Sequence, residues 1–465
     1  MPYTDDQTML CLAGLAYRGF NDAAVGRFHG DAVQRAIQHG LDDLAPVKGE
    51  WDLVWGPAVY RSPTSLLDDE LMYVVRRRQA PARYVVAIRG TNPVSAFDWV
   101  FGDLWAAKTT AWRYGNGSAR ISLSSALGLA ILQGLRSDGP RRDDALWQAI
   151  DARLAGASGL EERLVAAVTR FGGQALAPLR NELVELTQEL LQFRSSQPMD
   201  GDDAHVRSLA SLWKSHVRLE VVALVNAAEA LGGGRVELAL LALLEDETRL
   251  RTSLGVGTDL STFLACAVER AREEKPEEPV EVIVTGHSKG GALSSTVALW
   301  LCETQGRDAR PAERWDPDRR ATVHCWSFAG PTAGNADFAK RSDDLLGPRC
   351  HRIANRLDVV PHAWASVDLA RIPTLYDAKV VAPLPALDDL VGTITALTSD
   401  LQYTQVGNLF TELPGTVDST KPLFFEQAVH QHMQAYLDAL KLGVDTVTLF
   451  DPLASLPRWT REESR

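Results

Sequence analysis

A single serine with a glycine two residues away on either side is the clearest sign of chemistry in this sequence. The stretch EVIVTGHSKGGALSS places Ser288 between Gly286 and Gly290, after a run of β-branched residues and before residues typical of a helix. Glycine lets two backbone segments approach closely, so such a strand-to-helix turn holds the serine hydroxyl out above the edge of a sheet. We predict that Ser288 is a nucleophile.

A serine hydroxyl attacks only when a base takes its proton and a carboxylate orients that base. With this type of turn, the acid and the histidine follow the serine in the chain. Asp358 comes directly after the strand-like HRIAN, in NRLDVVPH, where a loop after a late strand is expected. We predict that Asp358 is the acid, with Asp337 and Asp368 as alternatives.

Two histidines beyond the acid compete for the role of base. His430 and His432 stand two residues apart in AVHQHMQAYLDAL, at the start of a predicted helix, so their side chains cannot point the same way. His362 is only four residues from Asp358 and would need an unusual loop to reach the serine. We predict His432 as the base and retain His430 as the alternative.

An acyl transfer also requires donors for the oxyanion of its tetrahedral intermediate. The residue after the nucleophile, Lys289, offers its backbone N–H, and its side chain is expected to point to solvent. A second donor is expected after an early strand, where YVVAIRGTNP ends in Arg89, Gly90 and Thr91. We predict Thr91 as this donor, although GTNP is also compatible with an ordinary turn.

The elements around these residues predict an α/β fold with a helical block inserted into it. Strand patterns occur in LMYVVRRR, RYVVAIRG, VEVIVT, VHCWSFAG and CHRIANRLD, and helical patterns in STFLACAVERA and FFEQAVHQHMQAYLDAL. Between them, a long block rich in Ala, Leu, Glu and Arg has almost no strand pattern. We therefore predict that residues 1–135 and 251–465 form one α/β domain and that 136–250 are a helical insertion.

Composition limits the classes of partner and the compartment. The 465 residues carry a net charge of −12, which provides no basic field for a nucleic acid. The N-terminus lacks the basic start of a signal peptide, and no apolar run is long enough to span a bilayer. The five cysteines are widely spaced and indicate neither a disulfide framework nor a metal site. We expect a protein without a metal or cofactor that is cytoplasmic or is exported by a route independent of a signal peptide.

Taken together, these motifs resemble the class 3 lipases, the α/β hydrolases that include fungal triacylglycerol lipases and plant phospholipases. VVAIRGTNPVSAFDW is similar to the family's oxyanion segment, here with Thr91, Asp98 and Trp99. VIVTGHSKGGALSS resembles its nucleophile turn, with Lys289 where leucine is usual. SFAGPTAGNADFA, HRIANRLDVVPH, YTQVG and HQHMQAYL resemble the following loop, the acid segment, a late strand and the histidine segment. The resemblance covers residues up to about 135 and from about 255 onward.

The resemblance implies an α/β-hydrolase fold and a serine hydrolase that cleaves carboxylic esters of lipids through an acyl-enzyme, as a triacylglycerol lipase or phospholipase A. It also implies a lipid or ester substrate, at a membrane or lipid interface, and no metal in the chemistry. The insertion, 136–250, is then either a lid or a bundle that braces the domain or binds a partner. The competing functional hypotheses are a short-chain carboxylesterase and a non-catalytic scaffold on a hydrolase fold. The oligomeric state does not follow from the sequence.

Overall fold

The computed structural model describes the chain on both sides of one long central segment. The described residues are 2–18, 30–60, 70–79, 82–90, 109–115, 117–137, 258–309, 314–384, 387–444 and 449. The predicted insertion therefore lies outside the described residues beyond Ser137, and its role as lid, brace or partner-binding bundle stays a prediction. Thr91, Asp98 and Trp99 also lie outside them.

The main sheet is mixed, and in the described residues it has seven strands. They lie in the order β1 (Trp51–Tyr60), β2 (Glu70–Arg77), β3 (Ala82–Ile88), β8 (Val280–His287), β9 (Ala321–Phe328), β11 (Cys350–Asn355) and β13 (Leu409–Leu413). The pairs β1–β2 and β2–β3 are antiparallel, and every pair from β3 onward is parallel. The carboxyl ends of the parallel strands therefore meet at one edge of the sheet, where the predicted nucleophile and acid follow β8 and β11.

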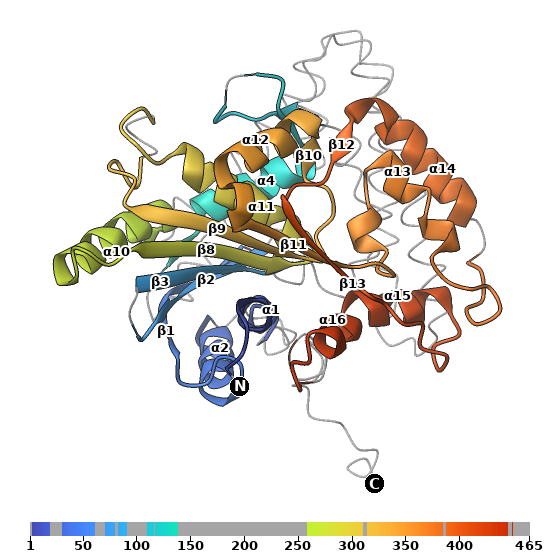
Figure 1. The fold of residues 1–465 in the computed structure, drawn as a ribbon, viewed down its shortest axis with the longest axis horizontal. Helices are drawn as coiled ribbons and strands as arrows, with labels where there is room; N and C mark the ends of the chain where they lie inside the picture. The colour runs from blue at the N-terminus through green and yellow to red at the C-terminus, as the bar shows by residue number, and fades with distance from the viewer. Residues whose placement is uncertain are drawn as a thin grey trace, which may run out of the picture.

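Helices cover both faces of this sheet (Figure 1). On one face pack α4 (Leu123–Gly134), α10 (Leu260–Glu274), α11 (Lys289–Glu303) and α12 (Ala336–Leu346), and on the other α1 (Asp5–Leu15), α2 (Gly30–Asp43) and α16 (Gln434–Ala439). Side chains alternate between the two resulting cores along each strand: Val282 and Val284 of β8 join the first core, and Ile283 joins the second. Both faces of the central strands are therefore buried, as the continuous apolar run VEVIVT indicates.

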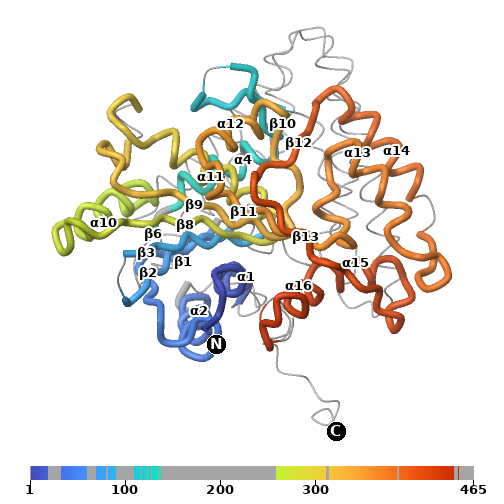
Figure 2. Tube along the Cα trace, in the orientation of Figure 1, coloured from blue at the N-terminus to red at the C-terminus, as the bar shows by residue number. Residues whose placement is uncertain are grey.

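A third core lies beside the end of the sheet and is built from the chain between β11 and α15 (Phe424–His432), as Figure 2 shows. It includes α13 (Ser366–Leu369), α14 (Leu387–Thr398) and the short turns of 3₁₀-helix Val360–His362, Ile372–Thr374 and Ser399–Leu401. Sequence patterns did not predict α14. This unit packs against the loop after β11 and against α15, so it supports both chain segments that carry the predicted acid and base.

Two small sheets complete the described fold. β4 (Thr109–Ala111), β5 (Arg120–Ser122), β10 (Gly334–Asn335) and β12 (Tyr403–Thr404) form one of them. YTQVG therefore contributes β12 to a small sheet, and the late strand of the main sheet is β13. The other sheet pairs β6 (Arg136–Ser137) with β7 (Thr258–Asp259). Ser137, the last described residue before the central segment, therefore pairs with Thr258, the first described residue after it.

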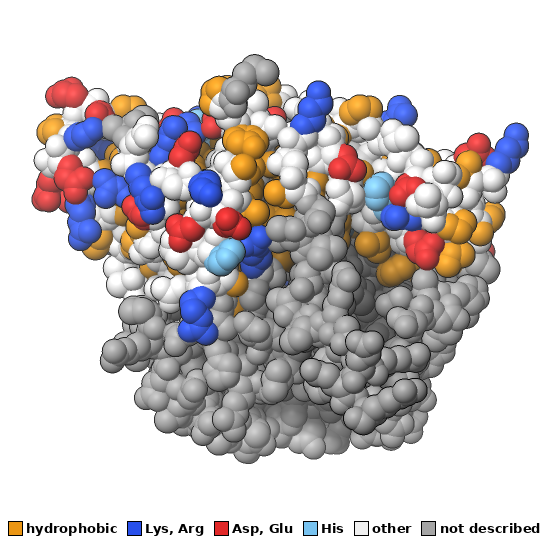
Figure 3. Space-filling view, turned by 90° about the horizontal axis from the view of Figure 1, so that it is seen from below, with side chains coloured by type: hydrophobic (Ala, Val, Ile, Leu, Met, Phe, Trp, Pro, Cys, Tyr) orange, Lys and Arg blue, Asp and Glu red, His pale blue; other side chains and the backbone are white. Residues whose placement is uncertain are grey.

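Charged side chains of both signs are interspersed on the described part of the face in Figure 3, which shows no continuous basic patch there. Ion pairs join several charged side chains of the described residues, as Arg83 pairs with Asp5 and Glu281. Within the described residues, no helix is both long enough and apolar enough to cross a bilayer.

Candidate active site

The turn that carries Ser288 joins β8 to α11. β8 ends at His287 and α11 begins at Lys289, so Ser288 is the single residue between them. Its backbone has φ 63° and ψ −131°, a conformation that non-glycine residues rarely adopt. The Ser288 N–H donates to the carbonyl of Phe328 at 3.0 Å, and the N–H of Gly291 donates to the Ser288 carbonyl at 2.8 Å. Neighbouring backbone thus holds the strained turn, as is typical of functional sites.

The two glycines around Ser288 are required by close backbone contacts. A Cβ on Gly286 would lie 2.2 Å from the carbonyl oxygen of Gly290, and a Cβ on Gly290 would lie 2.5 Å from the carbonyl oxygen of Ile88. The turn is therefore folded back on itself and pressed against the end of β3. The sequence pattern GHSKG predicted this packing correctly.

Replacing Gly286 by alanine should lower the free energy of unfolding by about 2–3 kcal/mol, because the new methyl group would overlap backbone atoms rather than a movable side chain. Gly392 provides a matched control, since it is exposed on α14 and has open space around its Cβ position. Gly392→Ala should raise the free energy of unfolding by about 0.5–1 kcal/mol. Urea unfolding measures both values, and equal changes in the two variants would contradict the packing described.

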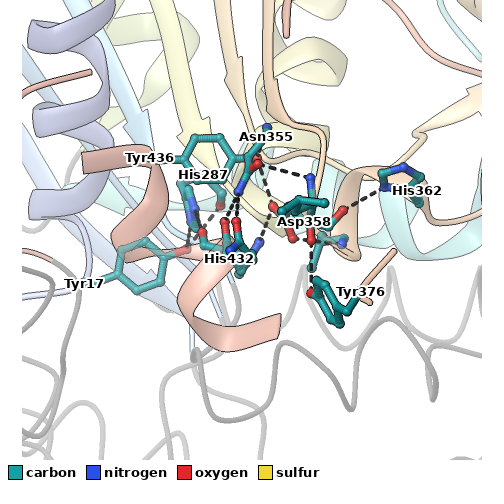
Figure 4. Close-up of polar contacts among 11 residues, drawn as sticks. Tyr17, His287, Asn355, Asp358, His362, Tyr376, His432 and Tyr436 are labelled. Atoms are coloured by element: carbon teal, nitrogen blue, oxygen red, sulfur yellow. Dashed lines mark hydrogen bonds and ion pairs between the residues drawn. The ribbon is translucent and has the colours of Figure 1, made fainter. Parts of the chain in front are cut away.

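The predicted acid and base are in direct contact. Nδ1 of His432 lies 2.9 Å from Oδ2 of Asp358, and these two side chains are 2% and 0% exposed (Figure 4). The hydroxyl of Tyr436 donates to the same oxygen at 2.9 Å, and the Val360 N–H donates to Oδ1 at 3.0 Å. Burial and the charge of Asp358 raise the pKa of the Tyr436 hydroxyl well above its ordinary value, so it stays a donor. Asp358 is therefore the acceptor, and Nδ1 of His432 carries the hydrogen.

Within the described residues, this arrangement leaves a nitrogen of His432 and the hydroxyl of Ser288 without hydrogen-bond partners. With a hydrogen on Nδ1, Nε2 of His432 holds a lone pair. Within the described part of the chain, neither this Nε2 nor Oγ of Ser288 has a hydrogen-bond partner, although both atoms are buried. Buried polar atoms are normally satisfied, so a pair of unsatisfied ones is a mark of a functional site.

His287 connects the serine turn to the histidine. Its ring lies 4.6 Å from that of His432, centroid to centroid, and its Nε2–H donates to the His432 carbonyl at 2.8 Å. Burial, and then the neighbouring His432, lower the pKa of His287 well below its ordinary value, so the imidazole is neutral. Because His287 directly precedes Ser288, this contact brings the predicted nucleophile and base to the same place.

The helix that ends at His432 is anchored to the sheet by amide groups. Nδ2 of Asn355, the last residue of β11, donates to the carbonyl of Gln431 at 2.8 Å and to its Oε1 at 2.7 Å. The Asn355 N–H donates to the hydroxyl of Tyr436 at 2.9 Å. Sequence reasoning missed His287, Asn355 and Tyr436. Of these three residues, only His287 could have been identified from the sequence, because it lies within the GHSKG motif.

The alternative site residues lie elsewhere. His430 is half-buried and, among the described residues, makes no contact with Asp358; burial lowers its pKa. Asp337 bonds to Ser118, and Asp368 pairs with Arg371 at 3.6 Å. His362 contacts the acid through the backbone only, because its Nδ1–H donates to the Asp358 carbonyl at 2.7 Å.

Two expectations about these segments were wrong. His430 and His432 lie in the last turn of α15, not at the start of a helix, because the chain breaks at Met433 (φ −124°, ψ −76°) before α16 begins. Lys289 does not point to solvent: its ammonium forms an ion pair with Glu70, and the two side chains are 18% and 0% exposed. A buried carboxylate needs such a partner, and Glu70 is far from Lys289 in sequence.

Of the two predicted oxyanion donors, the structure describes Lys289 but not Thr91. Lys289 opens α11, where the helix dipole favours negative charge. Thr91 lies outside the described residues, directly after Gly90. The described residues contain no group of three or more His, Cys, Asp or Glu side chains placed to hold a metal ion.

Comparisons with known proteins find sequences and a structure that are similar to this chain. A family model described as lipase (class 3) matches residues 208–367, which include Ser288 and Asp358 but not His432. Two proteins of Arabidopsis thaliana are similar: phospholipase A1-IIgamma, 35% identical over 94 residues (20% of this chain, 22% of that protein), and the chloroplastic galactolipase DONGLE, 31% identical over 100 residues (21% and 19%). The chain therefore spans about a fifth of the length of each of these two relatives.

A solved structure covers more of the chain. The crystal structure of M37 lipase superposes with a TM-score of 0.63 at 25% identity, over 97% of this chain and 99% of that one. This likeness, together with the mixed sheet described above, confirms the predicted α/β-hydrolase fold.

Proposed function

We propose that this chain, which belongs to the class 3 lipase family, hydrolyses the carboxylic esters of lipids. One observation carries the proposal: a buried aspartate holds a buried histidine whose second nitrogen, like the hydroxyl of Ser288, has no partner among the described residues. Nucleophilic catalysis by a serine requires an uncommitted hydroxyl and a base with a free lone pair.

The geometry supports the following steps. Nε2 of His432 takes the proton of Ser288 as Oγ attacks the ester carbonyl, and the same proton then passes to the leaving alcohol. Asp358, held by the Tyr436 hydroxyl and the Val360 N–H, orients the imidazole and stabilises its charged form. Water then attacks the acyl-enzyme with His432 again as the base.

The oxyanion formed in both halves of the reaction needs donors at the start of α11. The Lys289 N–H is the donor next to the nucleophile, and the helix dipole adds to its effect. Thr91 stays the predicted second donor, in the loop that follows Gly90. No metal enters these steps.

The names of the similar proteins support polar glycerolipids as the substrate class. One is named a phospholipase A1 and the other a galactolipase, so we propose that this chain cleaves an acyl ester of a lipid with a polar head group. A short-chain carboxylesterase is the competing function.

Mixed vesicles of phosphatidylcholine and galactolipid distinguish these functions. We expect the wild type to release fatty acid from the vesicles, and to cleave p-nitrophenyl palmitate at least as well as the butyrate. Activity on butyrate alone would favour the short-chain esterase. Release of no acid from any of these substrates, with detergent present, would favour the non-catalytic scaffold.

A further inference from the structure

Tyr17, a buried residue that follows α1, contacts the turn that carries Ser288 (the serine turn). It lies on the face of the sheet opposite to α11. Tyr17 is 2% exposed and lies directly after α1. Its hydroxyl donates to the carbonyl of His287 at 3.1 Å and lies 3.4 Å from Nδ1 of the same residue. Figure 4 shows Tyr17 beside His287, on the side of the site away from Asp358.

The same hydroxyl also accepts a hydrogen bond from the end of β3. The N–H of Gly90 donates to the Tyr17 oxygen at 3.1 Å. A Cβ on Gly90 would lie 2.3 Å from this oxygen, 2.4 Å from the His287 carbonyl and 2.9 Å from Cβ of Ser288. Only a glycine therefore lets the end of β3, the serine turn and the tyrosine meet.

The protonation states fix the direction of these bonds. Burial raises the pKa of Tyr17 above its ordinary value, so the hydroxyl keeps its hydrogen. Because Nε2 of His287 donates to the His432 carbonyl, its Nδ1 has a lone pair and faces the tyrosine as an acceptor. The Tyr17 oxygen thus accepts from Gly90, just after β3, and donates to the turn that carries Ser288.

A single hydroxyl is in this way bonded to the segment that leads into Ser288 and to the segment that leads into Thr91. Gly90 directly precedes Thr91, the predicted oxyanion donor, while the His287 carbonyl belongs to the peptide that leads into Ser288. Through its ring, His287 also holds the backbone of His432. Loss of the Tyr17 hydroxyl would leave the buried Gly90 N–H without this acceptor and would free the serine turn to shift relative to β3.

We propose that Tyr17 is a positioning residue. Through its bonds to His287 and Gly90, it sets the spacing between the turn that carries Ser288 and the loop that follows Gly90. This inference rests on the proposed function. Tyr17 does not contact the reacting atoms, so it acts on the transition state through the backbone groups that it holds. A misplacement of about 1 Å in a positioned group can reduce the rate by about 100-fold.

The test is Tyr17→Phe, which removes one oxygen and preserves the ring. We expect kcat for p-nitrophenyl butyrate to fall by about 10–100-fold with KM almost unchanged. The affinity for a trifluoromethyl ketone, whose adduct with Ser288 places an oxyanion in the hole, should weaken by a similar factor. Rates are divided by the number of sites that react with diethyl p-nitrophenyl phosphate, so a partly unfolded sample does not imitate the effect.

Tyr73→Phe is the matched control. Tyr73 is also buried, and its hydroxyl donates to the Leu12 carbonyl in α1, but it has no bond to the serine turn. A purely structural role for Tyr17 predicts similar losses of melting temperature in both variants and no change of kcat or of ketone affinity in either. That outcome would overturn the inference.

Ser288→Ala in the same assay separates this inference from the proposed function. If Ser288→Ala is inactive while Tyr17→Phe equals the wild type, only the role of Tyr17 is wrong. If Ser288→Ala retains the activity of the wild type, the proposed function itself fails, and the inference fails with it.

Discussion

Replacing Ser288 by alanine should lower kcat for ester hydrolysis by roughly 10⁴-fold or more, because it removes the hydroxyl that is proposed to form the acyl-enzyme. The substitution removes one oxygen that has no hydrogen-bond partner among the described residues, so the melting temperature should change little. Hydrolysis of p-nitrophenyl butyrate, followed with thermal unfolding, measures both quantities.

Ser295 is a matched control for this substitution. It is a buried serine of α11, and its hydroxyl donates to the Ala292 carbonyl of the same helix at 2.8 Å. Ser295→Ala should therefore keep kcat within a few-fold of the wild type. Equal activity of the Ser288→Ala and Ser295→Ala variants would show that the nucleophile is elsewhere.

Replacing His432 by glutamine should lower kcat by a similar factor, roughly 10⁴-fold or more. Glutamine fills much of the space of the imidazole and can still donate to Asp358, but it offers no nitrogen that takes a proton near neutral pH. The loss would therefore report the missing base rather than a cavity. Steady-state kinetics at several pH values measure it.

His430→Gln is the control for the base, since this histidine lies in the same helical turn and does not contact Asp358 within the described residues. It should retain kcat within a few-fold. A large loss of kcat in His430→Gln together with a small loss in His432→Gln would show that His430, not His432, is the base.

Local patterns predicted the features of the site that depend on neighbours in sequence. The apolar runs before Gly90 and Ser288 form β3 and β8, and the glycines of GHSKG occupy the close contacts that a strand-to-helix turn requires. Asp358 follows β11 as expected for an acid in a loop after a late strand. These predictions succeeded because strand pattern and turn chemistry are local properties.

The missed features depend on contacts between distant parts of the chain. Glu70, the first residue of β2, meets Lys289 because β2 lies only two strands from β8 in the sheet. Tyr17 meets His287 because α1, which it follows, packs against β8. The break at Met433 was missed because the helical pattern continues through it; the break lets α15 end at His432. α14 was missed because LDDLVGTITALT contains glycine and several β-branched residues, which are weak helix formers, and its packing in the third core stabilises it instead.

The most direct test of the central claim is to locate the residue that reacts with diethyl p-nitrophenyl phosphate, by mass spectrometry of the intact protein and of its peptides. The proposed mechanism predicts one phosphoryl group per chain, on the peptide that contains Ser288. It also predicts that Ser288→Ala carries no such group and that His432→Gln acquires it far more slowly. A group on another residue, or equal labelling rates in the wild type and in His432→Gln, would contradict a nucleophilic Ser288 activated by His432.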